Sequence, residues 1–209
     1  QPLADRVERA VMDVLIKHSS LSHAEVLAAV NEQAPGLQTP DDPLIEELLE
    51  SYAHPMYENG PHWQLRYSES EARRAADLKE IRSLLEVFAN TLNYRRQLTK
   101  DAVYWSDEEG RAVYSFFPIT TAIVTPLLLK YMHLPGKKVV ALPSSKTKLL
   151  TFKLKRDPNL DSLVGDDWLF LRFRQLRNLK ENPLLNRDLF LSQISYMSQS
   201  APSEQMALF

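Results

Sequence analysis

Apolar residues in the first third of the chain recur at the spacing of short helices. This spacing predicts a first helix over residues 3–18. Ser22 and Glu25 have the form of a capping box, which starts a second helix at His23 that ends before Pro35. Residues 39–43 open a third helix, with Ile45, Leu48 and Leu49 on its inner side. The Asn59-Gly60 pair, followed by alternating residues from Trp63 to Tyr67, predicts a β-hairpin.

Three short helices followed by a hairpin resemble a winged helix, so residues 1–67 are expected to form a winged-helix-like module. In DNA-reading members of that fold, the third helix commonly enters the major groove with basic or amide side chains. Here the third helix has no Lys or Arg and instead carries Asp41, Asp42, Glu46, Glu47 and Glu50. A polyanion would repel these carboxylates. We therefore expect the acidic module to bind a protein, or to touch DNA only through its wing.

The longest helical pattern covers residues 68–93 and predicts a connecting helix over 68–94. Its apolar residues are spaced like a short coiled-coil seam, at Leu78, Ile81, Leu85, Phe88 and Leu92. The seam covers barely two heptads. It predicts packing along the following domain, with a dimer seam as the alternative.

Strand and helix patterns then alternate and predict a small α/β domain over residues 95–197. Its expected elements are a hairpin of 102–105 with 112–117, a helix over 120–131 that Pro126 breaks or kinks, a buried strand 139–142, a helix 146–155 capped by Ser144 or Ser145, a strand 168–174 and a helix 186–197. Residues 159–165 are expected to connect the helix 146–155 to the strand 168–174.

Opening with a hairpin, this domain is loosely similar to the restriction-endonuclease-like fold. Nucleases of that fold carry an acidic-x-Lys motif on a core strand, and here the corresponding run, Ala141-Leu142-Pro143-Ser144, has no acid. The resemblance therefore implies a degenerate relative that does not cleave. The fold class expected for the whole chain is a winged-helix-like α+β module followed by this α/β domain.

Composition narrows the classes of protein further. There is no cysteine, which excludes disulfides and thiolate metal sites, and no apolar run approaches the roughly 20 residues of a membrane span. The five histidines show no paired metal-ligand spacing, and no Gly-rich phosphate loop is present. We expect a cytoplasmic protein with no catalytic residues, no metal and no cofactor.

Charge divides the chain into two unlike parts. Residues 1–93 contain 8 Lys and Arg against 16 Asp and Glu, whereas residues 94–209 contain 17 against 11. This division is typical of two domains with different partners, the basic one facing an anionic ligand. It is equally consistent with two halves that attract each other.

A basic cluster in the second half is the predicted nucleic-acid surface. Lys and Arg neutralise phosphates, so this surface predicts sequence-independent DNA binding. Its members are Lys146, Lys148, Lys153, Lys155, Arg156, Arg172, Arg174 and Arg177. The aromatic residues among them are expected to belong to the core.

Two other functions fit the same residues. The helix start at Ser144-Ser145-Lys146 follows a buried strand, and free backbone N–H groups there would hold a phosphorylated ligand or substrate. The protein could instead be a purely structural subunit of a larger assembly, acting through its acidic third helix.

The last five residues, Gln205-Met206-Ala207-Leu208-Phe209, resemble the pentapeptide by which bacterial replication and repair proteins dock on the DNA sliding clamp. That motif has Gln, an apolar residue, usually Ser or Asp, and then Leu-Phe, so Gln205, Met206, Leu208 and Phe209 fit it and Ala207 departs from it. Residues 198–209 are expected to form a flexible tail that presents the peptide. The resemblance implies a non-catalytic adaptor in DNA replication, repair or antiviral defence, with the sliding clamp and DNA as partners.

Overall fold

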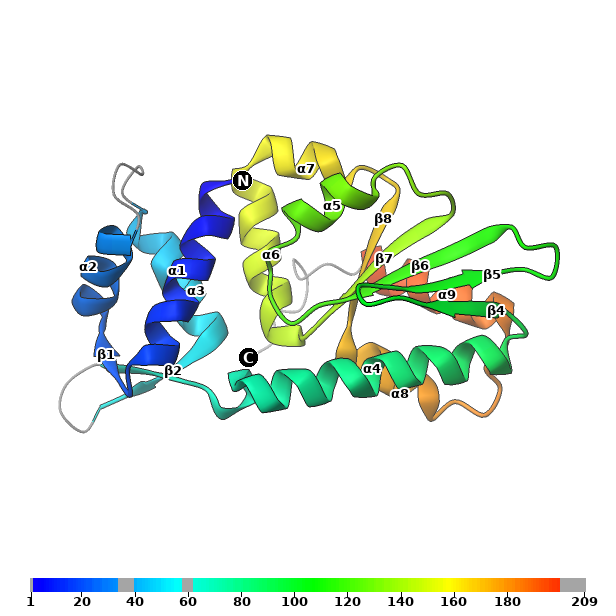
Figure 1. Ribbon diagram of the computed structural model, residues 1–209, viewed down its shortest axis with the longest axis horizontal. Coiled ribbons are helices and arrows are strands. Elements are labelled where there is room, and N and C mark those ends of the chain that lie inside the picture. Colours follow the sequence, from blue (N-terminus) through cyan, green and yellow to red (C-terminus); the bar gives the residue numbers. More distant parts are fainter. Residues whose placement is uncertain (1, 34–39, 58–61, 200–209) are drawn as a thin grey trace.

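The computed structural model describes residues 2–33, 40–57 and 62–199. The described chain is a mixed α+β structure with two sheets (Figure 1). In chain order its elements are α1 (Leu3–Lys17), β1 (Leu21–Ser22), α2 (His23–Gln33), α3 (Asp42–Tyr52), β2 (Ala53–Met56), β3 (His62–Leu65), the 3₁₀ turn η1 (Tyr67–Glu69), α4 (Glu71–Thr91), β4 (Arg95–Leu98), β5 (Val103–Ser106), β6 (Ala112–Pro118), α5 (Thr125–Tyr131), β7 (Lys137–Leu142), α6 (Ser144–Arg156), α7 (Pro158–Val164), β8 (Trp168–Arg172), α8 (Phe173–Lys180) and α9 (Arg187–Gln199).

The N-terminal part contains the three expected helices and a small antiparallel sheet in the order β1-β3-β2. The capping box before α2 is confirmed, because the Ser22 N–H donates to Glu25 at 2.7 Å and the Glu25 N–H donates back to the Ser22 hydroxyl at 3.3 Å. Strands β2 and β3 pair as the predicted hairpin. Its Asn59-Gly60 turn lies outside the described residues.

Helix α4 runs along one face of the larger sheet, at the bottom of Figure 1. Ile81, Leu85, Phe88 and Leu92 are buried in a core with α8, α9 and that sheet face. The apolar seam therefore packs inside the chain, as predicted. None of the described helices combines the length and the apolar character that crossing a membrane requires.

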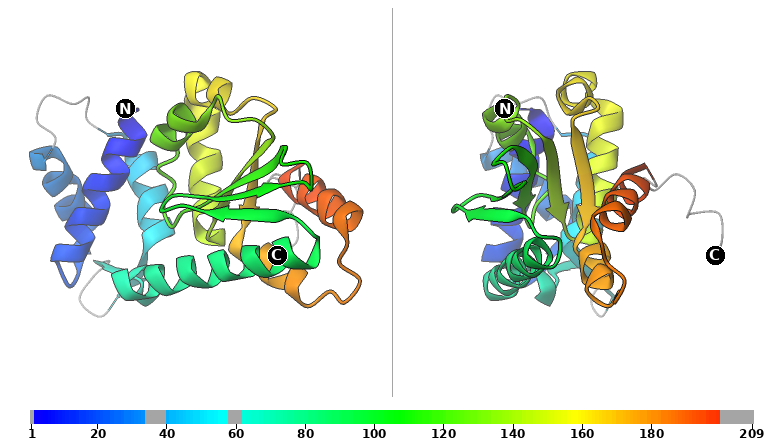
Figure 2. Two further views of the ribbon diagram at one scale, coloured as in Figure 1. Left: turned by 45° about the vertical axis from the view of Figure 1, so that its right-hand side comes forward. Right: turned by 90° about the vertical axis from the view of Figure 1, so that its right-hand side faces the viewer.

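The larger sheet has the strand order β4-β5-β6-β7-β8. Strands β4, β5 and β6 are antiparallel neighbours, while β6, β7 and β8 run parallel. Figure 2 shows helices on both sides of this sheet and the N-terminal helices at one end of it. Strand β7 is buried on both faces, as its continuous apolar run predicts: Val139 and Ala141 face one core, and Val140 and Leu142 face the other.

The second of these cores extends into the N-terminal part of the chain. It joins residues of α1, α2 and α3, such as Val11 and Leu48, to Val140, Leu149 and Trp168 of the α/β part. The predicted boundary between residues 1–67 and 95–197 therefore does not coincide with a break in the apolar core. Division into two domains stays a prediction.

Several local predictions were wrong, each for an identifiable reason. Pro126 does not kink a helix over 120–131, because α5 begins only at Thr125 and places Pro126 in its first turn, where no N–H is needed. Residues 159–165, predicted only as a connection, overlap helix α7. The Asp157 carboxylate caps the N–H groups of Asn159 and Leu160 and so starts α7.

Two further boundaries differ. Strand β8 ends at Arg172 and helix α8 begins at Phe173, so the predicted strand 168–174 is too long. The expected cap of α6 is also wrong, since Pro143 occupies the N-cap position and the helix begins at Ser144.

Gly136 is required at the turn that leads into β7. Its φ is +77°, and a Cβ built there would lie 2.8 Å from the Val113 carbonyl oxygen. Gly110, in the β5–β6 hairpin, has a similar φ of +84° but nothing within 4 Å of such a Cβ. The two glycines share one backbone conformation and differ in their surroundings.

We expect Gly136→Ala to lower the free energy of unfolding by about 3 kcal/mol, because left-handed strain and a backbone clash add together. Gly110→Ala is the matched control and should cost about 1 kcal/mol, since it has the strain alone. Urea denaturation of both variants measures the difference. Equal losses would show that the close approach of Gly136 to β6 does not matter.

Candidate nucleic-acid interface

Two of the predicted DNA-contacting lysines lie inside the protein. Lys146 and Lys153, on α6, are 0% and 1% exposed. Neither has a surface with which to contact a phosphate, so their assignment to the nucleic-acid surface was wrong. The reason is tertiary: α6 packs against α3 of the N-terminal part, and the lysines on that side are covered.

Lys153 is surrounded by acceptors from two distant segments. Its Nζ donates to Asp5 Oδ1 at 2.8 Å, to the Glu8 carboxylate and to the Ala122 carbonyl at 3.1 Å. Glu8 also accepts the Ala122 N–H at 2.7 Å and the hydroxyl of Tyr52. Asp5 Oδ2 is buried without a hydrogen-bond partner among the described residues. The amine is thus fixed between α1 and the loop that precedes α5.

Lys146 forms a second buried pair beside the first. Its Nζ donates to Glu69 at 2.7 Å and to the Ser51 carbonyl at 2.9 Å, and it lies 3.6 Å from the ring centroid of Tyr52. Burial lowers the pKa of Lys146 to about 8, although the Glu69 carboxylate acts in the opposite direction.

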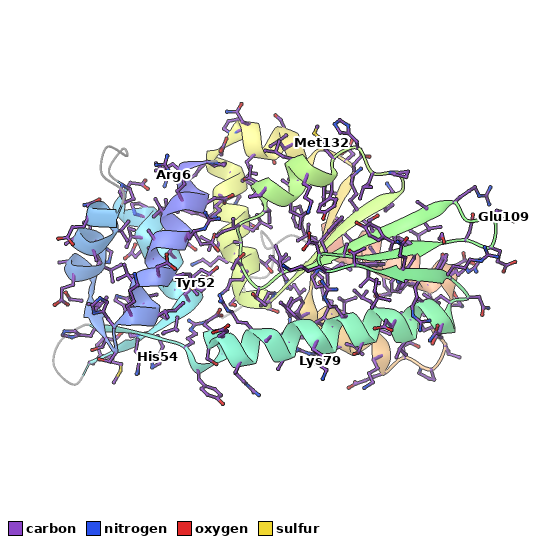
Figure 3. All side chains as sticks on the ribbon, in the orientation of Figure 1. Arg6, Tyr52, His54, Lys79, Glu109 and Met132 are labelled. Carbon is purple, nitrogen blue, oxygen red and sulfur yellow. The ribbon has the colours of Figure 1, made fainter. Side chains whose placement is uncertain are left out.

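Tyr52 connects the two pairs, because its hydroxyl contacts Glu8 and its ring contacts Lys146. It stands at the end of α3, where Figure 3 labels it. Burial, followed by the charge of Glu8, raises the pKa of the Tyr52 hydroxyl well above its usual value. We call the connected set of Asp5, Glu8, Tyr52, Glu69, Lys146 and Lys153 the buried clasp.

Exposed ion pairs extend the clasp along α3 and α6. Lys148 lies 3.0 Å from Glu47 and 2.6 Å from Glu50, and Arg156 pairs with Asp41. Three of the five carboxylates that made the third helix acidic therefore face basic residues of the same chain. Of the two interpretations of the divided charge, attraction between the halves is the one this geometry shows.

The other predicted basic residues divide into paired and unpaired groups. Arg177 is held by Asp77 and Glu80, at 2.7 Å from each. Arg172 is half-buried, and its backbone N–H donates to Gln175. Lys155 and Arg174 are exposed and have no carboxylate partner in the described part of the chain. DNA contact by the predicted surface would therefore depend mainly on these last two residues.

Lys155 and Arg174 do not form one compact patch. Leu142 and Arg172 are register partners, so α6 and α8 begin side by side at the carboxyl ends of β7 and β8. Arg174 stands in the first turn of α8, whereas Lys155 lies near the far end of α6, roughly 16 Å along the helix axis from Ser144. A ligand touching both must be extended, as a nucleic-acid backbone is.

The helix start at Ser144-Ser145-Lys146 has acidic neighbours. A hollow of about 160 Å³ at this point is lined by Glu47 and Glu50 as well as by Arg66 and Lys148. Arg66 donates to the carbonyls of Ala53 and Glu50, and Lys148 is paired with both carboxylates. The basic groups are already engaged while the carboxylates would repel a phosphate, so this geometry disfavours the phosphorylated-ligand alternative.

The partners of the buried lysines were missed from the sequence. One signal was present: Glu8 falls on the apolar side of α1, between Val7 and Val11, where a charged side chain needs a partner. No comparable signal identifies Glu69, which lies in a short 3₁₀ turn.

Among the described residues, no three His, Asp or Glu side chains come together as a metal site would require. No family model matches the chain, and the comparisons with curated proteins and with solved structures found no match. Any proposal about function must therefore come from its own residues.

We expect Lys153→Met to lower the free energy of unfolding by about 3–5 kcal/mol, because Asp5 and Glu8 would remain buried without their cation. Lys148→Met is the matched control on the same helix, and should cost less than about 1 kcal/mol because the Lys148 side chain is 45% exposed. Urea denaturation at neutral pH compares the two. A loss for Lys153→Met no larger than that for Lys148→Met would contradict the importance of the clasp.

Proposed function

We propose that the protein is a non-catalytic, DNA-associated adaptor that docks on a bacterial sliding clamp through Gln205–Phe209 and contacts DNA without sequence preference through its basic half. Replication, repair and defence against foreign DNA all use proteins of this kind, and such a protein would work in the cytoplasm. The observation that carries the proposal is the pentapeptide. It lies outside the described residues.

The chemistry of the peptide suits a docking function. Leu208 and Phe209 are apolar anchors of the type that fill a pocket on a partner, while the Gln205 amide fixes the register by hydrogen bonds. Ser, Ala and Pro residues at 200–203 precede the peptide and are typical of a linker.

The arrangement of the elements is compatible with the proposal. The order α1-β1-α2-α3-β2-β3, with a three-stranded sheet, is the one expected of a winged helix. A mixed sheet that opens with antiparallel strands and continues with parallel ones agrees with the loose similarity to the restriction-endonuclease-like fold. Both folds are common among proteins that act on DNA, but many unrelated functions share such folds, so the support is general.

A non-cleaving role is supported by the strands themselves. The sequences of β4 to β8 are RRQL, VYWS, AVYSFFP, KKVVAL and WLFLR, and none contains Asp or Glu. An acidic-x-Lys motif therefore has no place in this sheet.

The orientation of α3 also bears on how DNA would be bound. Its residues Glu47 and Glu50, and Asp41 at its N-cap, face α6 through ion pairs. A helix in that position cannot enter a major groove without first leaving α6. The proposal therefore assigns DNA contact to the α/β part, and a further protein partner of the acidic module would have to use the face of α3 that α6 leaves open.

For the clamp, we expect Leu208→Ala combined with Phe209→Ala to weaken binding to a purified bacterial clamp at least about tenfold, because both pocket-filling anchors are removed. Ala207→Asp is the control and should not weaken binding, since the motif accepts Asp there. Surface plasmon resonance measures both. Undiminished binding by the double variant, with folding unchanged in thermal unfolding, would refute clamp docking through this peptide.

For DNA, the logarithm of affinity should fall steeply with the logarithm of salt concentration. Arg174→Ala should weaken binding to all sequences and reduce this salt slope by about one, since one phosphate contact is lost. Lys148→Ala is the control, because its charge is already neutralised by Glu47 and Glu50. Fluorescence anisotropy across salt concentrations tests the proposal. Salt-independent binding, or an equal effect of both variants, would count against the predicted surface.

A further inference from the structure

One row of side chains across the larger sheet is unexpectedly polar. Each strand contributes one residue to this row, and register partners on adjacent strands place their side chains on the same face of the sheet. In strand order, the row is Gln97, Tyr104, Ser115, Lys138 and Trp168. The next row on that face, Ala102, Phe117, Val140 and Phe170, is apolar core. Ser115 and Lys138 of this row are buried, and buried polar groups cost free energy unless they find partners.

A hollow of about 390 Å³ opens over this row at its β4–β6 end. Gln97, Tyr104 and Ser115 line it together with Arg95 and Ser106. Leu134, from the turn held in place by Gly136, forms an apolar wall. We call this the sheet-end hollow. It lies toward the β5–β6 hairpin, whose tip is marked by Glu109 in Figure 3, at the opposite end of the sheet from the buried clasp.

The polar groups of the sheet-end hollow are largely unused within the protein. Ser115 is 2% exposed, and its hydroxyl has no partner among the residues that the structure describes. The side chains of Gln97 and Ser106 likewise make no hydrogen bond within the described ranges. Beyond the hollow, Lys138 is engaged, since its Nζ donates to the Leu134 carbonyl at 3.2 Å and lies 3.6 Å from Asp167. Hydrogen-bonding capacity is therefore left for a ligand.

The charge of the hollow is positive. No Asp or Glu lines it. By contrast, the hollow at the start of α6 is lined by Glu47 and Glu50, and another hollow near the end of α6 is lined by Asp41 and Asp157. Arg95 is exposed and forms no ion pair with any described residue.

Other charged side chains near the hollow already have partners within the protein. Arg96 is held by Asn90 and by Glu86, 3.4 Å away. The acids of the adjacent hairpin, Asp107 and Glu109, are paired with Arg111 at 2.6 and 3.0 Å. Among the described residues that line the hollow, Arg95 is consequently the charged group left for a ligand to meet.

We infer that the sheet-end hollow binds a phosphate-bearing ligand about the size of one nucleotide. Its volume falls in the range of roughly 300–1,000 Å³ that small-ligand pockets occupy. Arg95 binds the phosphate, while Gln97, Ser106 and Ser115 hydrogen-bond the rest of the ligand beside the Tyr104 ring. Such a ligand could come from a DNA strand, in which case the inference rests on the proposed DNA contact, or it could be a free nucleotide.

Isothermal titration with deoxyadenosine monophosphate, and anisotropy with a short 5′-phosphorylated single-stranded DNA, test the two sources. Arg95→Ala should weaken binding at least about tenfold, because a charge-assisted contact is lost. Ala112→Trp should weaken it as well by filling the hollow, which Ala112 lines. Deoxyadenosine, which lacks the phosphate, should bind far more weakly. An effect of Arg95→Ala on both probes assigns the site to a strand, and an effect on the monophosphate alone assigns it to free nucleotides.

Lys148→Ala is the control for this site, since Lys148 lies on α6, is already paired with Glu47 and Glu50, and does not line the hollow. Failure of wild-type protein to bind either probe would overturn the inference. Unchanged binding by both Arg95→Ala and Ala112→Trp would overturn it too. If Arg174→Ala alone weakened DNA binding, the proposed DNA contact would stand without the hollow. Clamp binding by the pentapeptide, measured separately, would be unaffected by any of these results.

Discussion

The contact of Lys153 with Asp5 and Glu8 determines how the two parts of this chain meet. These three groups are buried, so a placement of α1 on α6 that separated Lys153 from Asp5 and Glu8 would leave buried charges without a partner. Tyr52 and the Lys146–Glu69 pair extend the same constraint to the end of α3 and to the 3₁₀ turn η1 that precedes α4. The apolar residues around the clasp bury apolar surface area between the two parts of the chain. Many relative orientations of the two parts would bury a similar area. The charged groups require Lys153 to lie beside Asp5 and Glu8, and we expect this requirement to contribute more to the specificity of the interface than to its stability.

The ion pairs between the two parts also help to explain why the first part of the chain is acidic and the second part is basic. An acidic first part and a basic second part suggest separate partners when the charges are only counted. In the structure, Lys148 and Arg156 are placed against carboxylates of α3, and Lys146 and Lys153 are taken out of solvent altogether. A count of charges overestimates the field that a ligand meets, because each internal pair removes one basic group from the surface. What a partner can recognise is the remainder, such as Arg95, Lys155 and Arg174.

Features set by neighbours in sequence could be predicted, and features set by distant segments could not. The Ser22–Glu25 cap, the seam of α4 and the doubly buried strand β7 depend on local spacing, and all three are present. Burial of Lys153 depends on residues nearly the whole chain length away, and a lysine on an amphipathic helix looks solvated until that contact is known. Strand β4 was missed because it is an edge strand with all four residues exposed, so it has no apolar alternation. Helix α7 could have been found, since Asp157-Pro158 is a helix start of a familiar kind.

The sheet-end hollow illustrates the same limit for function. Gln97, Tyr104 and Ser115 are unremarkable in sequence, and only the pairing of β4 with β5 and of β5 with β6 brings them into one row. Arg95 could be read from sequence as one basic residue among 25 Lys and Arg, and its lack of an internal partner distinguishes it from most of the predicted surface. A short docking peptide is the opposite case, because it functions through its own side chains and needs no fold to be recognised. The proposed docking peptide can therefore be recognised from the sequence and the hollow only from the structure, and the two proposals place docking and ligand binding in separate parts of one protein.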